Sequence, residues 1–257
     1  MRPRLPFSLK AALLASCVFC PFATSASVSD GSLGNVMYVG DSITHGVNSG
    51  SYRWALHKIF ADNGISYSTA GINTGNYSGG VAAGISYGGR VFNNAHSSQA
   101  SARAYEIAGR ADGANDLLSD GNNGTLNDRL SAVTQNLLGD MDTMVEAMKT
   151  ANSGAEIIVL SIPCWTQHAN GNSSATHQAV ADYNESLKNW GRDKDGVTVI
   201  DVNQGIIDVA SSTPFYGVRT MFNNPTADGL HPNAQGDLLM AGNLARGMGY
   251  AGRSAGQ

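Results

Sequence analysis

NVMYVG, residues 35–40, is a short apolar run that ends at a glycine, as a buried strand does. Residues 51–63 follow with apolar side chains at helical spacing, and Gly64 predicts the end of that helix. Residues 65–70 predict a second strand. A strand, a helix and another strand in this order are typical of a parallel sheet with helices packed on its faces.

The alternation of strands and helices continues toward the C-terminus. Strands are expected at residues 156–160 (EIIVL) and 197–201, and helices at residues 97–107, 130–148, 175–190 and 233–247. Residues 71–89 contain seven glycines and follow neither a helical nor a strand period, so they predict a long loop. The predicted fold class is therefore α/β, a three-layer α/β/α sandwich with a central parallel sheet.

Residues 1–26 are typical of a signal peptide. Three basic residues precede an apolar stretch at residues 11–23 that is too short to span a bilayer, and Thr24-Ser25-Ala26 offers a cleavage site. We therefore expect a secreted or periplasmic protein with one domain at residues 27–257. A lipid anchor is the alternative, because Leu14-Ala15-Ser16-Cys17 resembles a bacterial lipobox that would carry the lipid on Cys17.

The composition limits the expected partners. The net charge is −4 and no stripe of lysine and arginine is present, so neither nucleic acid nor an anionic membrane surface is expected to bind. Cys164 is the one cysteine outside the predicted signal peptide, so no internal disulfide is expected. The histidines show no HxxxH or HExxH spacing, and no metal or cofactor is expected. The oligomeric state is left open.

The first motif with candidate catalytic residues is Gly40-Asp41-Ser42-Ile43-Thr44-His45-Gly46, which begins at the end of the first predicted strand. A serine at a strand-to-helix turn lies beside backbone amides that no helix has yet used, at the edge of the sheet where ligands bind. The alternative is an ordinary turn in which Ser42 or Thr44 caps a helix. The GxSxG elbow typical of α/β-hydrolases does not fit, since Thr44 occupies the place of its last glycine.

The second motif is Asp228-Gly229-Leu230-His231-Pro232, which leads into the last predicted helix. A serine hydroxyl is a weak nucleophile until a base takes its proton, and histidine suits that role near neutral pH. A carboxylate fixes the tautomer of such a histidine, and a tight turn from Asp228 to His231 presents both side chains together. A capped helix start is the alternative for this motif taken alone.

The third motif is Gly113-Ala114-Asn115-Asp116. Ester hydrolysis passes through a tetrahedral oxyanion that needs hydrogen-bond donors already in place, and the Asn115 amide is such a donor. Taken alone, the tetrapeptide is also common turn chemistry.

The ordered set GDSITHG, GAND and DGLHP resembles blocks I, III and V of the SGNH (GDSL-like) hydrolase superfamily, across residues 40–232. The resemblance implies a flavodoxin-like sheet with Ser42 as nucleophile, His231 as base and Asp228 as its orienting partner. It also implies that the Ser42 amide and the Asn115 side chain are oxyanion donors. The run GDSITHGVNSGSYRWAL looks like the start of esterases that remove acetyl groups from xylan and related glycans.

Two stretches depart from the family pattern. The second block normally supplies a glycine amide to the oxyanion hole, whereas residues 94–98 (NAHSS) hold none. Ser97 is a stand-in candidate for that donor, and Gly75, Gly79 and Gly80 are the other candidates. Residues 104–112 (AYEIAGRAD), where an apolar strand normally precedes the third motif, are mostly polar. Either residues 105–108 form a short strand or a core strand is missing, which would misplace Asn115.

The resulting hypothesis is a serine esterase that forms an acyl-serine intermediate and removes short acyl groups, acetyl above all, from a small-molecule or glycan ester. Its presumed substrate rim is rich in Gly, Asn and Ser, and no apolar lid helix of the sort long acyl chains need is evident. One alternative is a lipase or lysophospholipase of the same superfamily. The other is a glycan-binding module with weak catalysis, which the two departures motivate.

Overall fold

The computed structural model describes residues 31–47, 51–75, 81–100, 126–163, 173–204 and 231–250. Its helices are α1 (Ser42–His45), α2 (Ser51–Asp62), α5 (Leu126–Ala151), α6 (Ser173–Arg192) and α7 (Ala234–Gly247). Its strands are β1 (Ser32–Met37), β2 (Val39–Gly40), β3 (Ser66–Ala70), β4 (Asn73–Thr74), β5 (Ser86–Tyr87), β6 (Arg90–Val91), β7 (Ala95–Ser98), β8 (Ile157–Leu160) and β9 (Val197–Ile200).

Parallel pairs form the centre of the described structure. β1 pairs with β3, β2 with β7 and β8 with β9, each in parallel. β4 adds to β7 in the antiparallel direction, and β5 and β6 form a separate antiparallel hairpin. Tyr38 separates β1 from β2, so consecutive parts of one extended segment pair with two different neighbours. Ser42 follows this segment and therefore lies at the carboxyl end of β2.

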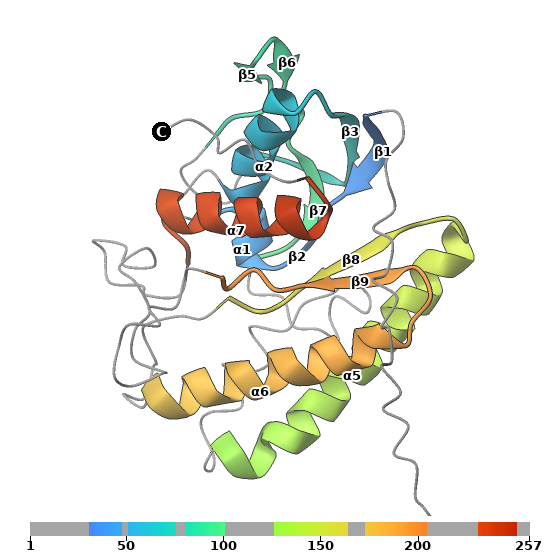
Figure 1. The fold of residues 1–257 in the computed structure, drawn as a ribbon, viewed down its shortest axis with the longest axis vertical. Coiled ribbons are helices and arrows are strands. Elements are labelled where there is room, and N and C mark those ends of the chain that lie inside the picture. Colours follow the sequence, from blue (N-terminus) through green and yellow to red (C-terminus); the bar gives the residue numbers. More distant parts are fainter. Residues whose placement is uncertain are drawn as a thin grey trace, which may run out of the picture.

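Helices cover both faces of β8 and β9. Ile157 and Val159 of β8 pack into a cluster with Leu187 and other side chains of α5 and α6, whereas Ile200 of β9 belongs to a second cluster with Met240 and other side chains of α2 and α7. Figure 1 shows the same arrangement, with α7 on one side of β8 and β9 and with α5 and α6 on the other. Three layers result, so the α/β/α prediction is confirmed.

The apolar runs and helical periods located most elements correctly. The predicted helices at residues 51–63, 130–148, 175–190 and 233–247 correspond to α2, α5, α6 and α7. The predicted strands correspond to β1 with β2, β3, β8 and β9. Gly64 has a φ of +75°, the left-handed geometry that the predicted helix end requires.

Two sequence-based expectations are corrected. The helix expected from residue 97 is wrong at its start, because Ser97 and Ser98 belong to β7. The loop expected at residues 71–89 contains two short strands, β4 and β5, since backbone pairing there needs no apolar pattern. The remainder of the expected helix at 97–107 and the polar stretch at residues 104–112 lie largely or wholly outside the described residues.

The N-terminal segment with Cys17, as well as Cys164, lies outside the described residues. Among the helices that the structure describes, none is long and apolar enough to cross a membrane.

Candidate active site

The turn between β2 and α1 presents Ser42. Asp41 is the N-cap residue of α1, and its Oδ1 accepts a hydrogen bond from the Ile43 amide at 2.7 Å. Gly46 ends the helix in the left-handed region at a φ of +87°, and its amide donates to the Ser42 carbonyl at 2.9 Å. Ser42 is thus the first residue of a one-turn helix, where the backbone amides have no partner within the helix. The alternative role for Ser42, a helix cap, belongs to Asp41 instead.

Gly40 permits this turn to be tight. A Cβ atom at Gly40 would lie 2.5 Å from Oγ1 and 2.9 Å from Cβ of Thr44, closer than non-bonded atoms approach. Thr44 is buried, and its Oγ1 lies 3.3 Å from the Tyr52 hydroxyl. The glycine of the motif therefore has a packing reason that is independent of any chemistry.

His231 lies within proton-transfer distance of Ser42. Its Nε2 atom is 2.8 Å from Ser42 Oγ, although the two residues are 189 positions apart in the sequence. His231 stands just before α7, whose N-cap residue Asn233 accepts hydrogen bonds from the amides of Gln235 and Gly236. The packing of α7 against α2, visible in Figure 1, brings the two distant ends of the chain together.

The carboxyl group beside this pair is electrostatically unusual. Asp41 is buried, with 4% of its surface exposed. Burial raises the pKa of Asp41 to about 6. The hydrogen bond from the Ile43 amide and the nearby His231 act in the opposite direction and lower it. Asp41 therefore titrates in the same pH range as a free histidine, next to the serine. The sequence motif contains Asp41, but its buried charge was not anticipated.

The structure argues against Ser97 as an oxyanion donor. Ser97 lies opposite Val39 in the β2–β7 pair, and its amide donates to the Tyr38 carbonyl at 2.7 Å. The amide of Gly75, another candidate, donates to the Asn94 carbonyl at 3.4 Å. An amide that is engaged inside a sheet is not available to bind an oxyanion. Gly79 and Gly80 lie outside the described residues.

Asn115 and Asp228 also lie outside the described residues. The structure therefore brings two of the expected site residues together, Ser42 and His231. The roles of Asn115 as oxyanion donor and of Asp228 as partner of His231 stay predictions.

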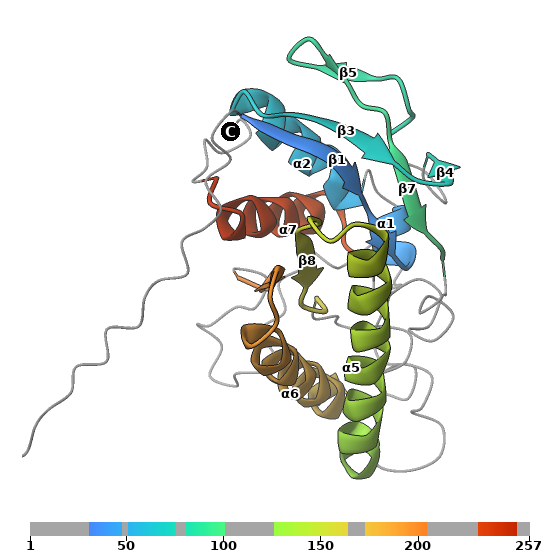
Figure 2. The same cartoon turned by 90° about the vertical axis from the view of Figure 1, so that its right-hand side faces the viewer.

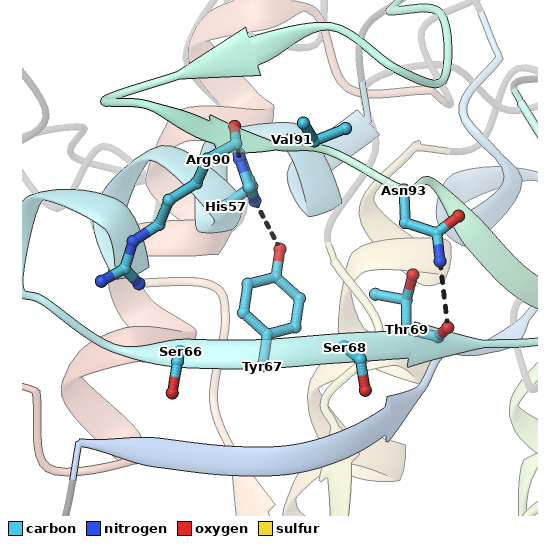
Figure 3. A pocket seen from close by; sticks show the side chains of 8 residues that line it. All are labelled: His57, Ser66, Tyr67, Ser68, Thr69, Arg90, Val91 and Asn93. Carbon is cyan, nitrogen blue, oxygen red and sulfur yellow. Dashed lines mark hydrogen bonds between the residues drawn. The ribbon is translucent and has the colours of Figure 1, made fainter.

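A hollow lies between β3 and the β5–β6 hairpin and includes neither Ser42 nor His231. It has a volume of about 370 Å³ and is lined by His57, Ser66, Tyr67, Ser68, Thr69, Arg90, Val91 and Asn93. In Figure 3, the Tyr67 hydroxyl points to His57, and their 2.8 Å hydrogen bond crosses the hollow. His57 also bonds the Arg90 carbonyl at 3.2 Å, so this histidine has structural partners on both ring nitrogens.

The aromatic residues around the glycine-rich segment anchor it to α2. Phe92 is buried with 1% exposed, and its ring lies 5.3 Å from that of Trp54. Tyr87 meets Trp54 edge-on at 6.3 Å, and its hydroxyl lies 3.4 Å from Asp62 Oδ2. These contacts anchor the segment from Tyr87 to Phe92 on α2.

Sequence reasoning missed several buried polar residues behind Ser42. Arg53, Asn94, His96 and Ser98 are each buried with no exposed surface. A signal was present for Arg53, because residues 53, 56 and 60 follow the i, i+3, i+7 spacing of the buried face of α2. None was present for His96 and Ser98, since a strand whose buried positions are polar has no apolar pattern.

The contact between Ser42 and His231 has the arrangement that serine hydrolases use for a nucleophile and its base. The model of the GDSL-like Lipase/Acylhydrolase family matches residues 38–239, and the chain belongs to this family of serine ester hydrolases. The superfamily suggested by the three motifs is thereby confirmed. No curated protein sequence matches the chain.

Solved structures with similar folds include esterases and a lipase. A carbohydrate esterase family 3 protein from Talaromyces cellulolyticus is 19% identical, with a TM-score of 0.55 over 83% of this chain and 95% of that one. An acetyl esterase variant with bound acetate ion gives the same values. The lipase Lip_vut3 from a goat rumen metagenome is 16% identical, with a TM-score of 0.56 over 86% of this chain and 99% of that one. These likenesses support the fold.

Proposed function

We propose that this protein is a secreted esterase that removes short acyl groups, acetyl above all, from carbohydrate esters. The observation that carries the chemistry is the 2.8 Å distance between His231 Nε2 and Ser42 Oγ. Such a pair meets the geometric requirement for a nucleophile and its general base.

The proposed reaction has two halves. Ser42 Oγ attacks the ester carbonyl carbon while His231 Nε2 takes the hydroxyl proton, and the same proton then goes to the leaving alcohol as the acyl-serine forms. Water that is deprotonated by His231 attacks the acyl-serine in turn, which releases the acid and restores the hydroxyl. The Ser42 amide at the start of α1 and the Asn115 side chain donate to the oxyanion, and Asp228 orients the imidazole.

Acetyl on carbohydrate is the favoured substrate for two reasons. The run at residues 40–56 resembles the start of glycan deacetylating esterases, and two structural neighbours are a carbohydrate esterase and an acetyl esterase. The alternative is a lipase with a preference for long acyl chains. The structural similarity to a lipase from a goat rumen metagenome motivates this alternative.

We also propose that residues 1–26 are a signal peptide and that residues 27–257 form the hydrolase domain. The basic start, the apolar stretch at residues 11–23 and the small residues before Ser27 support export. The N-terminal sequence of the exported protein tests this proposal. An N-terminus at Ser27 is expected, and a lipid-modified N-terminus at Cys17 would support the lipoprotein alternative instead.

Hydrolysis of p-nitrophenyl acetate by the protein and by Ser42→Ala tests the chemistry. We expect turnover by the unchanged protein and a loss of roughly 10⁴-fold or more in kcat for the variant, since loss of a nucleophile removes the covalent route. Ser186→Ala is a matched control, because Ser186 lies on α6 and its hydroxyl bonds the Asp182 carbonyl. Equal turnover by Ser42→Ala would refute Ser42 as the nucleophile.

A chain-length series of p-nitrophenyl esters, with acetate release from acetylated xylan, tests the substrate class. We expect kcat/KM to fall as the acyl chain lengthens beyond a few carbons. A rising series would establish the lipase alternative, and unchanged xylan acetylation would exclude that glycan as substrate.

A further inference from the structure

Arg53 is a buried charged residue that the proposed reaction does not itself use. It lies in the first turn of α2 with none of its surface exposed. Burial lowers the pKa of the guanidinium, and the surrounding tyrosines and Asp237 partly offset that effect. A buried arginine is costly unless its donors are well bonded, so its contacts indicate its role.

The guanidinium contacts the end of the helix that begins with Ser42. Arg53 Nε donates to the Thr44 carbonyl at 2.8 Å, and Nη2 donates to the His45 carbonyl at 3.2 Å. These carbonyls belong to the last two residues of α1, where a cation is favourable. Ser51 Oγ donates to the Thr44 carbonyl as well, at 3.2 Å. Two side chains in the first turn of α2 therefore bind the carbonyl groups at the C-terminal end of α1.

The other side of the guanidinium reaches two loop segments. Nη1 donates to the side-chain and backbone oxygens of Asn94, and Nη2 donates to the Gly75 carbonyl at 3.4 Å. Asn94 has a φ of +57°, and its Nδ2 donates to the Val81 carbonyl at 3.1 Å. Arg53 thereby connects α1 to the backbone on both sides of residues 76–80, at Gly75 and at Asn94.

His96 contacts the same Gly75 carbonyl. Its Nε2 lies 2.8 Å from that oxygen, and its Nδ1 lies 2.6 Å from Ser98 Oγ. Burial lowers the pKa of His96 to about 4, so the ring is neutral at pH 7. A neutral ring that donates from Nε2 accepts at Nδ1, and Ser98 therefore donates its hydroxyl proton to His96. The Gly75 carbonyl therefore accepts hydrogen bonds from both Arg53 and His96, which fixes the backbone at Gly75.

We propose that Arg53 is a positioning residue for hydrolysis: its guanidinium fixes the Ser42 turn against the Gly75 and Asn94 segments. This inference rests on the proposed function. A base and a nucleophile separated by 2.8 Å lose rate steeply when either moves, so the support behind α1 controls kcat while binding of a small ester stays the same.

Arg53→Met and Arg53→Lys test the proposal. Methionine fills part of the volume but leaves the Thr44 and His45 carbonyls without the guanidinium. We expect kcat on p-nitrophenyl acetate to fall about 100-fold with KM unchanged, the size of effect that a displacement of about 1 Å produces. Lysine keeps the charge but not the fork, so we expect a loss of roughly 10-fold. The rate at which a fluorophosphonate labels Ser42 falls by the same factors.

Arg90→Met is the matched control. Arg90 also donates from its guanidinium to a backbone carbonyl, that of Ile65, but it lies in β6. We expect this variant to lose thermal stability with kcat unchanged. The temperature of each assay is kept well below the Tm of each variant, so that loss of folded protein does not imitate loss of rate.

The outcomes separate this inference from the proposed function. Wild-type turnover that Ser42→Ala abolishes, together with full kcat and labelling rate in Arg53→Met, would overturn the role of Arg53 alone. An inactive wild-type protein would overturn the proposed function first. If Arg53→Met does not fold, Arg53→Lys decides: a kcat equal to that of wild type overturns the proposal, and a reduced kcat with unchanged KM supports it.

Discussion

Two regions of the molecule differ in whether they bury titratable side chains. The catalytic region comprises α1, α2 and α7 with β1, β2, β3 and β7, and the helical region comprises β8 and β9 with α5 and α6. Figure 2 shows them one above the other. Wherever the burial of the side chain is described, the buried Asp, Arg and His residues lie in the catalytic region: Asp41, Arg53, His57, His96 and Asp237.

The buried polar side chains described in the helical region are all neutral amides and hydroxyls. Asn184 accepts from the Ile162 amide at 2.8 Å and donates to the Ile162 carbonyl at 2.9 Å. Asn203 Nδ2 donates to Ser161 Oγ at 3.1 Å. These groups satisfy the backbone where β8 and β9 end, above a core of Leu, Ile, Val and Met side chains. The difference suggests that one region positions reacting groups and the other provides stability.

Removal of the base gives the largest expected effect. His231→Ala leaves Ser42 without the group at 2.8 Å that takes its proton. We expect kcat on p-nitrophenyl acetate to fall by roughly 10⁴-fold or more, while the free energy of unfolding changes little. Steady-state kinetics together with urea denaturation check both halves of this statement. A full-rate variant would mean that the pair is not the catalytic one.

A core substitution in the helical region is expected to lower stability and leave the catalytic rate unchanged. Leu187 is 1% exposed in the cluster of α5, α6, β8 and β9, and Leu187→Ala removes buried methyl groups and leaves a cavity. We expect the free energy of unfolding to fall by about 2–5 kcal/mol. The value of kcat/KM, measured well below the Tm, stays the same.

Leu238→Ala is the control for this substitution. Leu238 is 38% exposed on α7, so we expect a loss of only about 0.5 kcal/mol or less. If Leu187→Ala lowered kcat/KM as strongly as it lowered stability, the separation between the two regions would not hold.

The same contrast explains which parts of the protein the sequence could predict. The helical region was located well, since EIIVL and the periodic apolar side chains of α5 and α6 carry the signal by which strands and helices are recognised. β7 was missed because buried His96 and Ser98 take the places that apolar residues usually fill. Its burial depends on hydrogen bonds with Gly75 and within the strand, which no local pattern reveals.

The candidate site shows a similar division. Motifs identified Ser42 and His231, and the packing of α7 against α2 places them together. Ser97 was a misleading candidate, because strand pairing, not residue type, decides whether its amide is available. The role of Arg53 depends on carbonyl groups of Thr44, His45 and Gly75, and the orientation of a carbonyl is a property of the folded backbone alone.

A further expected effect is a pH dependence of stability in the catalytic region. The pKa of Asp41 is raised by burial from 3.8 to about 6, so between these values the folded chain binds a proton that the unfolded chain releases. The contribution of this group to stability is therefore greatest below about pH 4 and is lost as the pH rises through 6. Asp41→Asn removes the titration and keeps a side-chain oxygen for the Ile43 amide.

Thermal unfolding of both proteins between pH 4 and 7.5 measures this contribution. We expect the Tm of wild type relative to that of Asp41→Asn to rise as the pH is lowered from 7 to 4. His96 titrates in the opposite sense, because its pKa is lowered to about 4 and the unfolded chain takes up the proton first. Both proteins keep His96, so the difference between their Tm values isolates Asp41. Parallel Tm curves would show that burial does not raise the pKa of Asp41.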